Sequence, residues 1–401
     1  MKVRTGFLAT AAVTLLVASP AVANVENTTL LSHTPSGKLP DAPVTGVVMS
    51  GDGRVGRYVA YVSAATNITN GARKVQNIYL VKRARPWTNS GSAWKEGPTS
   101  LATKGANGDS WSPAFDGFDD VHATYATKCL AFVSKASNLV RGDSAPADVF
   151  LMKVRSGKIK RLAGTGGASE VALDGQCRDI AYVKNGKPYL ATVNGKGRPH
   201  RAGGSGAKTL NLSANGETLT YERRGSVYVY ELGKGARKLA AGTHPWSEKW
   251  ARSFTFERDG KIFQGSLKGA PAVKQVEQIG LGGAVGSQPN MSAGGGNVAY
   301  AIGPLLAFNT YKVPKGACTP DTYPSSSLKN GIAEVLSELA RFGVTLPDLP
   351  GLGILGRAAA VALPDVIEPR MSAHYNYVVY SCENGPAYLT YIGDYQTGTV
   401  H

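Results

Sequence analysis

A strand-like string that recurs seven times constrains this chain more than any other feature of its sequence. Each copy spans six residues and carries Tyr or Phe at its fourth position. Self-similar units repeated along a chain are typical of repeat architectures, in which each unit folds alike. The seven copies are YVAYVS at 58–63, CLAFVS at 129–134, DIAYVK at 179–184, TLTYER at 218–223, SFTFER at 253–258, NVAYAI at 297–302 and YVVYSC at 377–382.

A second strand-like string follows each first string after a turn or loop, with an aromatic residue at its third position. Asn185-Gly186 and Asp259-Gly260 separate two of these pairs, and such dipeptides favour the left-handed backbone of tight hairpins. Several units add a third run, such as 158–164 and 236–242. The second strings are NIYLVKR at 77–83, DVFLMKV at 148–154, KPYLATV at 187–193, SVYVYEL at 226–232, KIFQGSL at 261–267, LAFNTYKV at 306–313 and PAYLTYI at 386–392.

Four short antiparallel strands per unit, repeated around a ring, describe a β-propeller. Turn sequences such as Ser50-Gly51-Asp52-Gly53 stand upstream of several first strings and supply the connection from an inner strand. We therefore predict an all-β fold: a seven-bladed β-propeller of four-stranded antiparallel blades. Six blades are the alternative if the unit at 250–279 or the interrupted sixth unit is not a true blade. The early segment 28–33 is expected to pair with the last unit and close the ring.

The repeats resemble those of the TolB-like β-propeller family. The resemblance is carried by Ser-x-Asp-Gly-x-Tyr-Val-Ala-Tyr type strings, by the segment 132–143 and by Asp148-Val149-Phe150-Leu151 followed by Ser156-Gly157-Lys158. It covers most of 27–313 and returns at 369–395. It implies a propeller outside the cytoplasm, a type used for protein binding, for gating a fused peptidase or for polysaccharide cleavage.

The two ends of the repeat region predict further segments. Residues 1–23 have the form of a signal peptide, with Lys2 and Arg4 before an apolar run and small residues at Ala21 and Ala23. Residues 24–401 are then expected to form one propeller domain. Residues 314–368 interrupt it as a small helical insertion, because apolar residues recur there at helical spacing; they are Leu328, Ile332, Val335, Leu336 and Leu339.

The chain has four cysteines, Cys129, Cys177, Cys318 and Cys382. An even number in an exported protein favours disulfides, and four cysteines allow three pairings. We predict Cys129 with Cys177 and Cys318 with Cys382. The apolar run at the N-terminus is too short to span a bilayer, which needs roughly 20 residues, so we expect a secreted protein, extracellular or attached to the cell envelope.

The loops that lead from one blade into the inner strand of the next are the best candidates for a ligand site. They share a face with the loops between second and third strands, at one end of the central channel. Tryptophan beside charged groups could stack on a sugar or anchor a protein partner, although the same indoles could pack between blades. The predicted ligand-binding residues are Asp109, Trp111, His244, Trp246, Trp250 and Arg252.

Motifs for catalysis or metal binding are weak. The sequence has no Gly-x-Ser-x-Gly and no His-Glu-x-x-His. Two acidic groups could hold a divalent cation, but ordinary turn formation explains them better, so we predict no cofactor and no metal. The two groups are Asp116, Asp119, Asp120 and His122, and Asn138, Asp143 and Asp148.

The formal net charge of +16, from 44 basic and 28 acidic side chains, favours nonspecific contact with polyanions. No nucleic-acid-binding module is present, so we expect no specific nucleic acid partner. We predict a non-catalytic binding or scaffolding protein that recognises an extracellular protein or glycan through its loop-bearing face. The alternative is a lyase-like enzyme acting on acidic polysaccharide, for which His244 with Arg252 is the one candidate pair.

Overall fold

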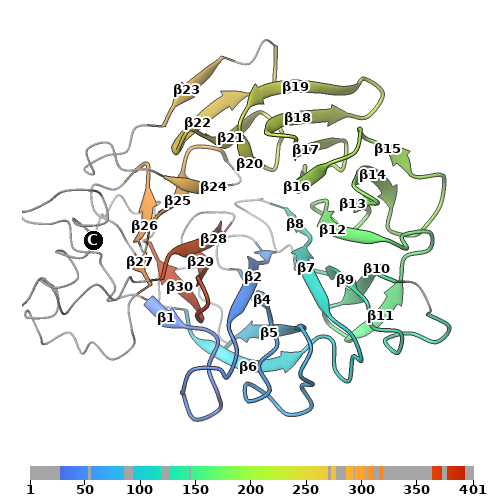
Figure 1. Cartoon of the computed structure of the whole chain (residues 1–401), viewed down its shortest axis with the longest axis vertical. Coiled ribbons are helices and arrows are strands. Elements are labelled where there is room, and N and C mark those ends of the chain that lie inside the picture. The colour runs from blue at the N-terminus through green and yellow to red at the C-terminus, as the bar shows by residue number, and fades with distance from the viewer. Residues whose placement is uncertain are drawn as a thin grey trace, which may run out of the picture.

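Seven four-stranded antiparallel sheets are arranged around a central axis in the computed structural model of this protein (Figure 1). The structure describes residues 28–52, 56–84, 94–118, 126–143, 146–269, 272–276, 286–292, 294–303, 305–310, 316–318, 364–372 and 377–392. The prediction of a seven-bladed propeller is confirmed, because the unit after Thr243 and the interrupted sixth unit each form a four-stranded sheet.

Each blade runs from an inner strand at the channel to an outer edge strand. Blade 1 contains β2 (Val44–Met49), β4 (Tyr58–Ser63), β5 (Asn77–Arg83) and β6 (Glu96–Leu101); blade 2 contains β7 (Ser110–Phe115), β9 (Cys129–Ser134), β10 (Asp148–Lys153) and β11 (Lys158–Arg161). Blade 3 contains β12 (Ala168–Leu173), β13 (Asp179–Lys184), β14 (Lys187–Thr192) and β15 (His200–Arg201); blade 4 contains β16 (Ala207–Leu212), β17 (Thr218–Arg223), β18 (Ser226–Glu231) and β19 (Gly235–Ala241). Blade 5 contains β20 (Thr243–Ser247), β21 (Ser253–Arg258), β22 (Lys261–Ser266) and β23 (Val273–Gln275); blade 6 contains β24 (Ser287–Met291), β25 (Val298–Ile302), β26 (Leu305–Phe308) and β27 (Gly316–Ala317). Blade 7 contains β28 (Val366–Met371), β29 (Tyr377–Cys382), β30 (Ala387–Tyr391) and β1 (Thr28–Leu30), and a short parallel pair joins β3 (Gly51–Asp52) to β8 (Gly117–Phe118).

The aromatic residues of the two repeated strings are cross-strand partners at the centre of the blades. Tyr61 lies opposite Tyr79 with ring centroids 5.4 Å apart, and five other blades repeat this stacked pair. Blade 6 departs from the pattern, since Tyr300 faces Ala307. The predicted aromatic of that blade, Phe308, lies one position further and pairs with Ala299. Side chains alternate between the two faces of a strand, so Phe308 points to the other face of the sheet.

Backbone hydrogen bonds join each blade to the next around the whole ring. The acceptor is a backbone carbonyl in the connection between the second and third strands of one blade. The donor is a backbone N–H at the start of the inner strand of the next blade or just before it, at 2.7 to 2.9 Å. These bonds place the hairpin turns and the inter-blade connections on one face, which we call the loop-bearing face; the opposite one is the far face. The seven bonds are Val44 to Gly385, Ser110 to Gln76, Gly167 to Ala147, Gly206 to Gly186, Gly242 to Gly225, Gly286 to Gly260 and Val366 to Gly303.

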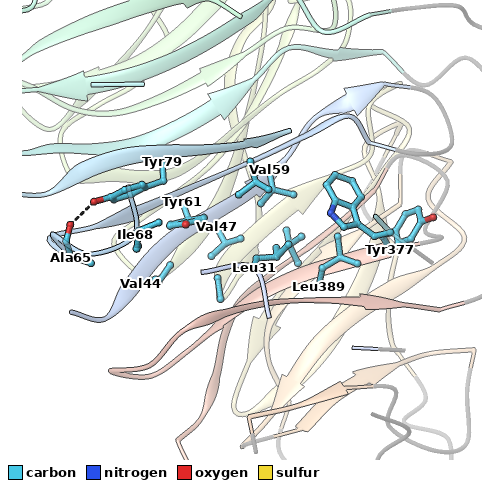
Figure 2. Packing of buried hydrophobic residues seen from close by; sticks show 14 residues of the cluster. Leu31, Val44, Val47, Val59, Tyr61, Ala65, Ile68, Tyr79, Tyr377 and Leu389 are labelled. Carbon is cyan, nitrogen blue, oxygen red and sulfur yellow. Dashed lines mark hydrogen bonds between the residues drawn. The ribbon is translucent and has the colours of Figure 1, made fainter. Parts of the chain in front are cut away.

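The chain closes the ring by adding its first strand to its last blade, as predicted. β1 pairs antiparallel with β30, with Thr29 opposite Leu389. Leu31 then enters an apolar cluster between blades 7 and 1 that also contains Val47 and Val59 (Figure 2). Its side chain is 1% exposed, so the closing segment is held by packing as well as by backbone hydrogen bonds.

Two disulfides link neighbouring blades, and both pairings match the prediction. Cys129 at the start of β9 bonds Cys177 in the turn before β13, joining blades 2 and 3. Cys318 after β27 bonds Cys382 at the end of β29, joining blades 6 and 7. Both bonds therefore restrain contacts between separate sheets.

Two sequence predictions lie outside the described residues. The signal peptide at 1–23 is one. The helical insertion at 314–368 is the other, apart from its ends at 316–318 and 364–368, which contain β27 and the start of β28 but no helix. Within the part of the chain that the structure describes, no helix has the length and hydrophobicity to cross a membrane.

Loss of the disulfide between blades 2 and 3 should lower stability. The bond links cysteines 48 positions apart. Removal of a disulfide that closes a loop of this size lowers the free energy of unfolding by about 2–4 kcal/mol. We expect the Cys129→Ser/Cys177→Ser variant to show a loss of this size in equilibrium urea unfolding. An unchanged unfolding midpoint would contradict the assigned pairing.

The closing segment should also respond to pH through His33. Burial by itself lowers the pKa of His33, but hydrogen bonds to the Thr34 carbonyl and to Glu96, at 2.7 Å each, raise it overall above 6.5. Because the pKa of His33 is higher in the folded than in the unfolded protein, protonated His33 stabilises the fold at pH values below its unfolded-state pKa. This stabilisation is lost as the pH rises through the folded-state pKa. The free energy of unfolding should therefore fall from pH 5.5 to pH 8 by more in the wild type than in His33→Gln. Parallel pH profiles for the two proteins would refute this.

Candidate functional site

A central channel of about 650 Å³ is lined by the inner strands of all seven blades. It extends along these strands from the loop-bearing face, where Thr45, Trp111 and His244 contribute, toward the far face, where Ser50 and Lys249 contribute. Ligand sites in proteins commonly enclose 300–1,000 Å³. The channel is therefore the candidate functional site.

Every inner strand carries a register irregularity at the same place, near its start. An extra residue here bulges the strand and turns its side chain and N–H away from the regular ladder. Four of the bulged residues precede proline, which has no N–H to lose from the ladder. In six blades the bulged residue has a left-handed backbone, with φ between 48° and 59°: Gly46, Ser112, Thr209, His244, Gln288 and Glu368.

Side chains of one blade accept the backbone N–H groups that these bulges free in the next blade. Glu368 accepts from Gly46 at 2.6 Å, and Gln288 accepts from Glu368 at 2.6 Å. Glu170 accepts from Thr209 at 2.8 Å and from Leu210 at 2.5 Å. The Glu170 and Glu368 carboxylates therefore position neighbouring inner strands, although both line the channel.

The far end of each inner strand is fixed by a capping side chain. The residue after the strand lies in the turn to the second strand, and its oxygen accepts backbone N–H groups from that turn or from the start of the second strand. Ser50 and Asp116, which we assigned to turns from the sequence, belong to this set. The seven residues, all no more than 4% exposed, are Ser50, Asp116, Asp174, Ser213, Glu248, Ser292 and Ser372.

Trp111 and His244 stand at the entrance on the loop-bearing face. The Trp111 indole Nε1 donates to the Ser169 carbonyl of the next blade at 2.8 Å, and the Lys135 ammonium lies 5.7 Å from its ring centroid. His244 Nδ1 donates to Glu257 at 3.0 Å. This hydrogen bond lowers the pKa of Glu257 and outweighs the opposing effect of burial. The imidazole is thus held by a carboxylate at the entrance.

Trp246 and Arg370 form a cation–π pair inside the channel. They come from the inner strands of blades 5 and 7, and the guanidinium lies 4.8 Å from the indole centroid. Burial lowers the pKa of Arg370 despite the charges of Glu368 and Glu170. Burial likewise raises the pKa of Glu170, against its two backbone hydrogen bonds. The middle of the channel therefore combines an aromatic face with a guanidinium and two carboxylates.

Lys249 occupies the far end of the channel. Its pKa is lowered by burial, although the Asp174 and Asp116 carboxylates favour the charged form. Its carbonyl accepts from Ala214 N–H at 2.8 Å, between two turns of the far face. A lysine amine thus lies at this end of the channel, and the Arg370 guanidinium lies nearer its middle.

The structure does not bring the six predicted ligand-binding residues together. Trp111, His244 and Trp246 line the channel. Asp109 lies on the loop-bearing face, but its carboxylate accepts from the Gln76 N–H at 3.0 Å. Trp250 and Arg252 lie on the far face, because the chain has traversed β20 before it reaches them. Trp250 is 45% exposed there.

Sequence reasoning missed the channel residues Glu170, Gln288, Glu368 and Arg370. They lie outside the repeated aromatic strings that make the blades recognisable. One signal was present in the sequence: a polar residue before proline recurs near the start of inner strands, as Ser112-Pro113, His244-Pro245, Gln288-Pro289 and Glu368-Pro369.

No group of three or more His, Cys, Asp or Glu side chains placed to hold a metal ion occurs in the described ranges. Asp116 caps its turn, as above, and its predicted companions Asp119, Asp120 and His122 lie outside those ranges. Asp143 and Asp148 contact Arg161 at 3.1 and 3.4 Å. Asn138 accepts from Asn107 N–H and donates to the Gly105 carbonyl. Asn138, Asp143 and Asp148 therefore shape a loop of the loop-bearing face, whereas Asp116 lies at the far face.

Sheet topology and channel together define a seven-bladed β-propeller closed by its N-terminal strand. No family model matches the chain, and no curated protein matches it. Among solved structures, TolB from Acinetobacter baumannii is similar, with a TM-score of 0.37 and 18% identity over 58% of this chain. The match covers 54% of the TolB chain, about half its length. The assignment to the propeller class therefore rests on the sheet topology itself.

Removing the Glu170 carboxylate should destabilise the joint between blades 3 and 4. Glu170→Ala leaves the Thr209 and Leu210 N–H groups without their acceptor, and a lost partner of this kind costs about 1–3 kcal/mol. Glu170→Gln keeps one acceptor oxygen and should lose less. Urea unfolding of the three proteins measures the difference, and equal stability of wild type and Glu170→Ala would contradict the assigned role.

Proposed function

We propose that this protein is a secreted, non-catalytic binding protein that recognises an extracellular protein or glycan through its loop-bearing face, with part of the ligand entering the channel. The observation that carries this proposal is the channel of about 650 Å³ with Trp111 and His244 at its entrance and Trp246 with Arg370 inside. Indoles bury a large rigid area at low entropic cost, and Trp and Arg dominate binding hot spots.

The compartment fits this proposal. Two disulfides join neighbouring blades, and disulfides persist in oxidising environments outside the cytoplasm. A ligand that meets the protein there is an extracellular or envelope molecule. Secretion through the segment 1–23 is part of the proposal.

The geometry supports binding more than the lyase-like alternative. That alternative needs His244 beside Arg252, and the structure places Arg252 on the far face, where its Nε lies 3.4 Å from Glu248. His244 faces Glu257 instead. His244 and Arg252 therefore do not form the pair that a lyase needs, in which the histidine would act as the base and the arginine would neutralise the uronate carboxylate.

A binding screen with channel variants tests the proposal. Purified wild-type protein is applied to arrays of glycans and of synthetic extended peptides, and hits are measured by calorimetry. Trp111→Ala and Trp246→Leu should each weaken the binding of a hit by about tenfold or more, as expected for a buried aromatic contact. Thermal unfolding verifies that both variants remain folded.

Trp250→Ala is the matched control, because Trp250 is an exposed tryptophan on the far face. Its binding should stay within twofold of wild type. Equal loss in all three variants, or loss in Trp250→Ala alone, would place the ligand elsewhere. Turnover of a glycan hit would overturn the non-catalytic assignment.

A further inference from the structure

Three consecutive blades carry basic residues around the turn between their second and third strands. The turns read Lys-Asn-Gly-Lys in blade 3, Arg-Arg-Gly-Ser in blade 4 and Arg-Asp-Gly-Lys in blade 5. They contain six cations against one carboxylate, Asp259. The corresponding turn of blade 7, residues 383–386, contains Glu383 and no Lys or Arg. We call the six residues the basic arc: Lys184, Lys187, Arg223, Arg224, Arg258 and Lys261.

The arc lies on the loop-bearing face and is continuous from blade to blade. The carbonyls of Gly186, Gly225 and Gly260 in these turns accept the N–H groups of Gly206, Gly242 and Gly286, which lead into the next inner strands. Each turn is therefore fixed against the following blade. None of the six arc residues is among those that line the channel.

Among the residues that the structure describes, no carboxylate neutralises the cations of the arc. In the portion of the chain with described coordinates, none of the six is in an ion pair within 4.0 Å. The Lys184 ammonium donates to the Gly164 carbonyl at 2.7 Å. By contrast, the adjacent Lys208 is paired with Glu222 at 3.1 Å.

Two arginines of the arc are held on aromatic rings. The Arg223 guanidinium lies 5.3 Å from the ring centroid of Tyr228, and that of Arg258 lies 4.1 Å from Phe263. Both rings belong to the stacked cross-strand pairs of the blades. Cation–π contact restricts a guanidinium, which lowers the entropic cost of binding an anion.

Protection of sheet edges does not explain the arc. Lys and Arg on outer edge strands prevent edge-to-edge pairing, and Lys158, Lys160, Arg237 and Lys238 on β11 and β19 fit that role. The arc residues flank turns between the second and third strands, where both strands are already paired on each side. The longer loops at the same place in blades 1 and 2 also carry two cations each, Arg73 with Lys74 and Lys135 with Arg141, whereas the turns of blades 6 and 7 carry none. Blades 3 to 5 differ in placing their cations directly on short hairpin turns.

We propose that the basic arc binds an acidic polysaccharide that lies across blades 3 to 5. A polymer with repeated anionic groups can contact cations that recur in successive blades, and planar guanidinium groups suit carboxylates and sulfates. Arg223 and Arg258 cover the aromatic rings that nucleic acid bases would need for stacking. The disulfide-bonded blades belong in compartments where acidic polysaccharides are found.

The proposal is separate from the channel function, since it uses a different set of residues. Polygalacturonate and heparin serve as probes in calorimetry at 150 mM salt. The variant Lys187→Gln/Arg224→Asn/Lys261→Gln removes one charge from each blade. Asn suits position 224, where the backbone is left-handed with φ of 48°. Affinity for a probe should fall about tenfold, as expected when three exposed charge contacts are lost.

Lys196→Gln/Arg198→Gln/Lys268→Gln is the matched control, which removes three exposed charges from turns on the far face of blades 3 and 5. Its affinity should stay within twofold of wild type. Equal losses in the two triple variants would show a net-charge effect and overturn the proposal. So would binding to neither probe, or tighter binding to duplex DNA at the same salt.

Discussion

The hydrogen bond from the start of each inner strand to a carbonyl beside the preceding hairpin turn is the interaction on which this propeller depends. It occurs at all seven joints of the ring, between backbone groups alone. Asn185-Gly186, Arg224-Gly225 and Asp259-Gly260 all have the positive φ values that aim the turn carbonyl at the next blade. With the blades fixed in this way, the inner strands surround a channel. The pairing of β1 with β30 completes blade 7, and Leu31 then packs between blades 7 and 1.

The bulged inner strands connect this scaffold to the candidate site. Each bulge frees a backbone N–H, and side-chain oxygens of Glu170, Gln288 and Glu368 accept hydrogen bonds from such groups. The carboxylates in the channel therefore already have structural partners. The Arg370 guanidinium, stacked on Trp246, is the charged group of the channel that we expect to contact a ligand. Outside the channel, the hairpin turns of blades 3 to 5 have two roles. Their carbonyls bond the next blade, and their Lys and Arg side chains form the basic arc.

The repeated strings predicted the blade number, the strand-like segment 28–33 predicted the ring closure, and the even cysteine count of an exported chain led to the two disulfide pairs. An aromatic residue such as Tyr182 opposite Tyr189 follows from strand alternation, which is a local property that the sequence records. Blade 6 shows the limit of this inference, because a one-residue difference in register puts Ala307 opposite Tyr300. The site was predicted only in part. Trp111, His244 and Trp246 line the channel, whereas Trp250 and Arg252 do not.

The sequence by itself determined the repeating unit, since strand alternation and turn chemistry act over a few neighbouring residues. It also determined that basic residues crowd the hairpins of the third to fifth units. Only the tertiary structure decided which side chains meet across the channel. His244 lies near the start of β20 on the loop-bearing face, whereas Arg252, eight positions later, lies in the turn after β20 on the far face. Trp246 and Arg370 come from different blades and stack. Ring closure brings distant strands together, and no local pattern encodes the distance between them.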